Sequence, residues 1–71
     1  MTRLERIEDL TVRTQRATFA EESARTGILK ALAGHSHWLD WGGEVDADGP
    51  TLSAFDAAID NLDEYLERGI G

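Results

Sequence analysis

The stretch that decides the fold is LSAFDAAIDNLDEYL, residues 52–66. Its large apolar residues recur at spacings of three, four, three and four, which places them on one face of a helix: Leu52, Phe55, Ile59, Leu62 and Leu66. Gly49-Pro50 interrupts the chain before this stretch, and Gly69 follows it as a typical stop signal. The sequence therefore predicts a helix over about residues 52–68.

The same stretch carries a row of acidic residues. Four carboxylates at spacings of four, three and four line one strip of the predicted helix, with Glu64 beside them: Asp56, Asp60, Asp63 and Glu67. Like charges four residues apart destabilise a helix by roughly 0.2–0.5 kcal/mol per pair. The strip is either a solvated face that keeps the chain soluble or a docking surface for a basic partner. We expect the docking role.

The N-terminal part of the chain reads as one long helix. Thr2 and Glu5 have the spacing of a capping box, and apolar residues recur from Leu4 onward to Ala31. No Gly, Pro or Asn lies between residues 4 and 26 to make a turn. We therefore expect a continuous helix over residues 2–33. The alternative is a break near Arg16, because residues 18–21 form a second capping-box pattern.

Another alternative for this region is a short strand. Residues 9–14, DLTVRT, alternate with a period of two, and residues 24–27, ARTG, follow downstream. Over about 20 residues this arrangement resembles the start of a ribbon-helix-helix repressor. The resemblance implies a dimer whose paired strands read the major groove of DNA. The chain departs from that family at Ile28-Leu29-Lys30, where small polar and basic residues usually open the second helix.

The unequal lengths of the two predicted helices suggest a dimer. A helix over residues 2–33 is about twice as long as one over residues 52–68, so a hairpin would leave Leu4, Ile7 and Leu10 uncovered. An apolar stripe of this kind is usually buried against another chain. We expect an all-α helical hairpin that self-associates through these three residues into a dimeric four-helix bundle.

Between the helices, residues 34–50 read as a loop rich in Gly and Asp, and both histidines of the chain lie in it. In an extended segment, His35 and His37 would face the same way, and Asp40 could add an oxygen ligand. These three residues are the candidate metal site. The alternative is that the histidines are exposed, or cap the preceding helix.

Trp38 and Trp41, the two tryptophans of the chain, lie in the same loop. Large aromatic side chains bury much area and could close the open end of a helical hairpin. Tryptophan is also enriched among the residues that dominate protein–protein binding, so the pair could anchor a partner. Both roles remain open from the sequence.

Length and charge limit the kind of protein further. The chain has 71 residues, which is enough for a single domain over residues 1–71, and it has no cysteine. Residues 1–33 hold six Lys/Arg and five Asp/Glu, whereas residues 34–71 hold one Lys/Arg and nine Asp/Glu. The acidic half would repel nucleic-acid phosphates. No apolar run approaches the length of a membrane span. We expect a cytoplasmic protein.

These observations predict a binding protein and not an enzyme. The chain has no glycine-rich phosphate loop and no nucleophile motif, and we expect no cofactor. We expect a small acidic regulator or inhibitor, of the antitoxin, anti-defence or accessory-subunit kind, that docks on a basic protein surface. The alternatives are a metal-binding protein or a ribbon-helix-helix-like repressor.

Overall fold

The computed structural model describes residues 2–68. Within this range four helices follow one another: α1 (Arg3–Arg16), α2 (Glu22–Asp40), α3 (Gly43–Asp46) and α4 (Gly49–Glu67). The prediction of an all-α protein is confirmed. The alternative strand over residues 9–14 is wrong, because these residues lie inside α1 and the described range contains no strand. The resemblance to ribbon-helix-helix repressors thereby loses the element on which it depends.

The continuous helix predicted over residues 2–33 is also wrong. The capping box at its start does form, with the Glu5 amide donating to Thr2 Oγ1 at 3.2 Å. The helix then ends at Arg16, and Ala17 adopts an extended conformation. The Arg25 guanidinium donates to the Ala17 carbonyl and lies 5.4 Å from the centroid of the Phe19 ring. These contacts from the next helix stabilise a reversal that contains neither glycine nor proline.

The loop predicted over residues 34–50 is mostly helical. Helix α2 continues through Gly34 to Asp40, and the short α3 occupies residues 43–46. Half-buried side chains near the end of α2, among them Trp38 and Leu39, pack against the core. This burial offsets the cost of a glycine inside a helix, about 1 kcal/mol relative to alanine.

Helix α4 begins three residues earlier than predicted. The Asp48 side chain accepts a hydrogen bond from the Thr51 amide at 2.8 Å, and Pro50 lies in the first turn. The carboxylate therefore caps the helix, and the fixed φ of proline suits this position. The last helical residue is Glu67, close to the predicted end.

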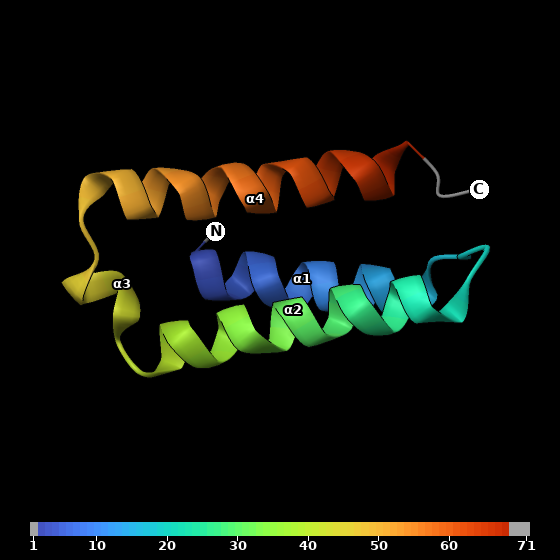
Figure 1. The fold of residues 1–71 in the computed structure, drawn as a ribbon, viewed down its shortest axis with the longest axis horizontal. Coiled ribbons are helices and arrows are strands. Elements are labelled where there is room, and N and C mark those ends of the chain that lie inside the picture. Colours follow the sequence, from blue (N-terminus) through green and yellow to red (C-terminus); the bar gives the residue numbers. More distant parts are fainter. Residues whose placement is uncertain (1, 69–71) are drawn as a thin grey trace.

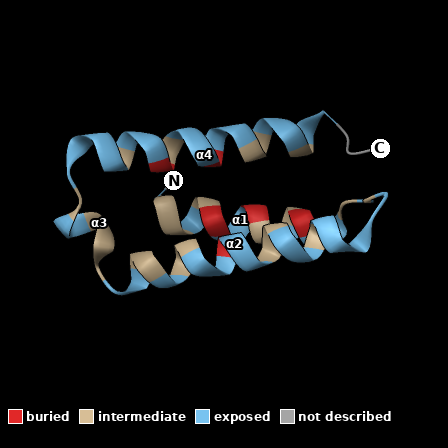
Figure 2. Ribbon diagram, in the orientation of Figure 1, coloured by how far each residue is buried: buried red, intermediate tan, exposed pale blue. Residues whose placement is uncertain are grey.

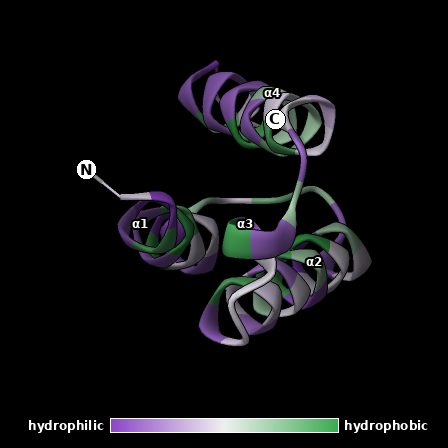
Figure 3. Ribbon diagram, turned by 90° about the vertical axis from the view of Figure 1, so that its left-hand side faces the viewer, coloured by the Kyte–Doolittle hydropathy of each residue, from purple (hydrophilic) through white to green (hydrophobic). Residues whose placement is uncertain are grey.

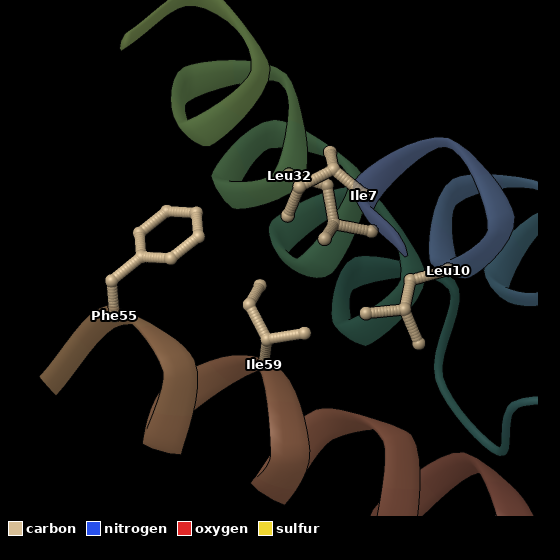
Figure 4. Close-up of a cluster of buried hydrophobic side chains, with 5 residues drawn as sticks. All are labelled: Ile7, Leu10, Leu32, Phe55 and Ile59. Atoms are coloured by element: carbon tan, nitrogen blue, oxygen red, sulfur yellow. The ribbon is translucent and has the colours of Figure 1, made fainter. Parts of the chain in front are cut away.

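The three long helices surround one small core. Helices α1 and α2 run antiparallel, and α4 runs parallel to α1 (Figure 1). Seen from the end, α1, α2 and α4 occupy the corners of a triangle, with α3 at that end of the molecule (Figure 3). The buried hydrophobic residues face its interior (Figures 2 and 4) and comprise Ile7, Leu10, Leu32, Phe55 and Ile59.

The predicted self-association stripe lies largely inside this core. Ile7 and Leu10 are 1% and 2% exposed, and Leu4 is half-buried. Because the chain reverses after α1, α2 and α4 of the same molecule cover the stripe. The expectation that Leu4, Ile7 and Leu10 need a second copy to cover them is therefore wrong.

Thr14 generates a prediction about stability. It is 0% exposed, and its Oγ1 has no hydrogen-bond partner in the described structure. A buried polar group without a partner costs about 1–3 kcal/mol. We expect Thr14→Val, which keeps the side-chain shape, to raise the free energy of unfolding by about 1 kcal/mol, as measured by urea denaturation.

Thr11 on the same helix provides the matched control. Its hydroxyl donates to the Ile7 carbonyl at 2.8 Å, so Thr11→Val removes a hydrogen bond that is made. This variant should show no such gain. A Thr14→Val protein less stable than the wild type would contradict the assignment of an unsatisfied hydroxyl.

Candidate functional site

The acidic strip of α4 faces a row of arginines on α1. Arg3 binds Asp56 through two hydrogen bonds, from Nε to Oδ1 at 2.8 Å and from Nη2 to Oδ2 at 2.9 Å. Its Nη1 also donates to Glu44 Oε2, in α3, at 2.7 Å. A two-pronged contact of this kind fixes geometry as well as adding energy. Arg3 therefore sets the position of α4 along α1 and ties α3 to both.

Two further ion pairs continue the row. Arg6 Nη2 lies 2.5 Å from Asp60 Oδ1, and Arg13 Nη1 lies 2.6 Å from Asp63 Oδ1. The side chains of the pairs keep between 28% and 66% of their surface exposed, so each pair contributes little by itself. Together they give three carboxylates of the strip a counterion within the same molecule.

The remaining acids of the strip have different surroundings. Glu64 pairs with Arg68 one turn further along α4. Glu67 has no ion pair among residues 2–68. The alignment of Asp56, Asp60 and Asp63 is thus explained by packing of α4 on α1, and a basic partner is not needed to account for it.

The pKa of the Asp56 carboxyl is lowered from its ordinary value of 3.8, chiefly because Arg3 donates hydrogen bonds to the ionised form. A carboxyl with a lowered pKa in the folded state adds stability above its unfolded pKa, and this stability is lost as the pH falls through the folded pKa. We expect the wild type to lose stability on acidification from about pH 5 to pH 2. Asp56→Asn should lose less over the same range, as followed by urea denaturation at each pH.

A suitable control for this titration is Glu67→Gln, which removes a carboxylate without an ion pair in the described structure. Its acid dependence should match that of the wild type. If Asp56→Asn also matched the wild type, the Arg3–Asp56 contact would not be part of the acid response.

Trp38 closes the α3 end of the core. Its ring lies 5.2 Å from the Phe55 ring, and the His35 ring meets Phe55 edge-on at 5.1 Å. A Cβ atom at Gly43 would lie only 2.2 Å from Nε1 of Trp38. Glycine at this position therefore lets α3 approach the indole ring. Of the two roles open to Trp38, the structure favours packing.

Alanine substitutions at two of the glycines should change the stability of the protein in opposite directions. Gly43→Ala forces a methyl group into the Trp38 ring, and we expect a loss of about 1–3 kcal/mol of unfolding free energy. Gly34 lies inside α2 with nothing within 4 Å of its Cβ position. Gly34→Ala should therefore gain about 0.5–1 kcal/mol. Thermal denaturation of both variants tests this, and a stabilised Gly43→Ala protein would refute the close contact.

The structure does not assemble the predicted metal site. His35, His37 and Asp40 lie on a helix, where residues two apart point in nearly opposite directions. His35 contacts Phe55, whereas the His37 ring lies 5.4 Å from Trp41. Among residues 2–68, no three His, Cys, Asp or Glu side chains are grouped so that they could hold a metal ion. The expectation failed because it assumed an extended segment.

Trp41 and Val45 are the most exposed large hydrophobic residues in the described structure, at 79% and 84%. Helix α2 ends at Asp40, so Trp41 projects from the turn between α2 and α3. Asp40 and Asp46 are exposed beside the pair in sequence, and neither forms an ion pair within residues 2–68. We call Trp41, Val45, Asp40 and Asp46 the corner patch.

Sequence reasoning singled out Trp41 but missed Val45. The available signal was the position of Val45 four residues after Trp41, across a Gly-Gly pair that marks a turn. Glu44 was missed as well, since its partner Arg3 lies 41 residues away in the chain.

Comparison with known proteins identifies no family: no protein-family model, no curated protein and no solved structure matches the chain. Among the described residues, no helix combines the length and the apolar character needed to cross a membrane. What the chain binds has to be inferred from its own surface.

Proposed function

We propose that the protein is a small, acidic, non-catalytic interaction module that regulates or inhibits a partner protein with a basic surface. The observation that carries the proposal is the exposure of Trp41, 79% of whose surface is open to solvent. Burying a large aromatic side chain is a major source of stability for so small a chain. A tryptophan left outside the core is available to a partner, and tryptophan is enriched at binding hot spots.

The surroundings of Trp41 support a basic partner. Val45 is a second exposed apolar residue, four positions further along the chain, and Asp40 and Asp46 carry charge without an ion pair in the described structure. Residues 34–71 hold nine Asp/Glu against one Lys/Arg, so the whole region carries a negative field. Such a field speeds the approach of a basic surface and disfavours acidic competitors. An apolar pocket ringed by Lys or Arg is the complementary site.

The corner patch replaces the acidic strip as the proposed centre of binding. Asp56, Asp60 and Asp63 already face arginines of α1, so a partner would have to compete with those pairs. Glu67 lies further along α4 without an ion pair in the described structure and remains available as a secondary contact, whereas Glu64 would first have to leave Arg68. The proposed setting is still the cytoplasm, and the antitoxin, anti-defence and accessory-subunit roles remain the candidate classes.

The experiment compares capture by the full chain and by two variants. Trp41→Ser combined with Val45→Ser removes the apolar part of the corner patch. Tyr65→Ser is the matched control, because Tyr65 is an exposed aromatic residue on α4, 45% exposed. Each protein is first compared by circular dichroism and then used as bait in its native cells, with crosslinking before capture.

We expect the wild type and Tyr65→Ser to recover the same partner, and the double variant to lose it. With the purified partner, titration followed by tryptophan fluorescence should show binding weakened about 30-fold or more, as for a hot-spot residue. The affinity should also fall with added salt. A double variant that keeps its affinity for the partner would overturn the proposal.

A further inference from the structure

A groove of about 580 Å³ runs between α1 and α2. Its walls are mainly apolar and include Ile7, Thr11 and Val12 from α1 and Leu29, Leu32 and Ala33 from α2. Val12 keeps 41% of its surface exposed although it lies on this apolar wall. The groove is thus a second region, separate from the corner patch, where a large apolar side chain, Val12, is open to solvent.

Helix α4 does not cover this groove. The arginines that hold α4 include Arg6 and Arg13, and at about 100° per residue Val12 lies roughly a third of a turn from them around α1, and Glu8 lies somewhat further away. Figure 3 shows α4 on one side of the α1–α2 pair. The groove therefore needs an occupant from outside the chain if its apolar walls are to be shielded from water.

The exposed charges along α1 are arranged so that two antiparallel copies of this helix would attract each other. Glu8 and Arg16 are exposed and lie four residues before and after Val12, about 6 Å along the helix axis in each direction. Neither has an ion pair within residues 2–68. Glu5 adds to the acidic N-terminal half of this face. Two such helices attract when antiparallel, because each acidic end meets a basic end.

We propose that this groove is the surface through which two copies of the chain associate. The α1 helices pack antiparallel about a two-fold axis at Val12. Glu8 of each copy faces Arg16 of the other, and the Val12 side chains lie at the centre. An interface of this type uses the same patch on both copies. It requires nothing from Trp41, so the partner-binding proposal and this one can fail separately.

The overall charge of the chain supports this choice of surface. Each copy has a formal net charge of −7, which opposes association through most faces. Along α1, however, the acidic Glu8 of the groove lining is balanced by the exposed Arg16, eight residues further on. The acids of α3 and α4 lie on other parts of the molecule. The α1–α2 face is thus one on which two copies can approach with little repulsion.

The test uses charge reversal and mixing. Glu8→Arg places two arginines opposite each other at both ends of the interface, and Arg16→Glu places two glutamates there. Each variant alone should have a dimer dissociation constant raised about tenfold or more, because like charges now face each other. Mixed in equal amounts, the two variants should form a heterodimer, since every facing pair is again opposite in charge. Sedimentation velocity and native mass spectrometry measure this.

Controls separate association from folding. Glu67→Arg makes the same charge change as Glu8→Arg on an exposed α4 position and should dimerise like the wild type. Circular dichroism confirms that each variant is helical. Should Arg16→Glu fail to fold, Val12→Lys replaces it, and this variant should be monomeric and helical. Trp41→Ser with Val45→Ser should remain dimeric.

Three results would overturn the proposal. One is a wild-type chain that stays monomeric at every concentration reached in sedimentation. Another is a Glu8→Arg or Val12→Lys protein that is folded and dimerises as tightly as the wild type. The last is a mixture of the two charge-reversed variants that contains no heterodimer while both are folded.

Discussion

The burial of Ile7 and Leu10 is the interaction on which the rest of the structure depends. These two side chains of α1 lie with Leu32 of α2 and Ile59 of α4 in one cluster (Figure 4). Helix α1 contacts both other long helices. With only five buried apolar residues in the described core, every long helix relies on this centre. The reversal at residues 17–21 is what brings α2 back to it.

The periodic parts of the sequence predicted their structure well. The apolar spacing over residues 52–66 identified α4, and the Thr2–Glu5 pattern identified the start of α1. A break near Arg16 was expected only as the alternative, from the capping-box pattern of residues 18–21; the chain does break there, but that cap does not form, because α2 begins at Glu22 without a side-chain cap. The contact that stabilises the turn joins Arg25 to the Ala17 carbonyl and Phe19. Such a contact exists only once the chain has turned. Local patterns of capping and apolar spacing do not contain it.

The acidic strip shows what pattern reading can and cannot supply. The strip itself was visible in the sequence, but its counterions were sought in another molecule. Arg3, Arg6 and Arg13 are spaced by three and seven, and so share a helix face that matches the strip. That correspondence was present in the sequence and could have been found by comparing the two helices. The different surroundings of Trp38 and Trp41 could not be found in this way, since they follow from the residue at which α2 ends.

The way α4 is held has a consequence for how the molecule opens. It is attached by Phe55 and Ile59 in the core and by arginine pairs at the surface, which salt screens. The α1–α2 hairpin has its own turn contacts and does not depend on those pairs. Salt therefore weakens the attachment of α4 more than it weakens the α1–α2 turn. Amide protons of α4 should accordingly exchange with solvent faster at high salt than at low salt.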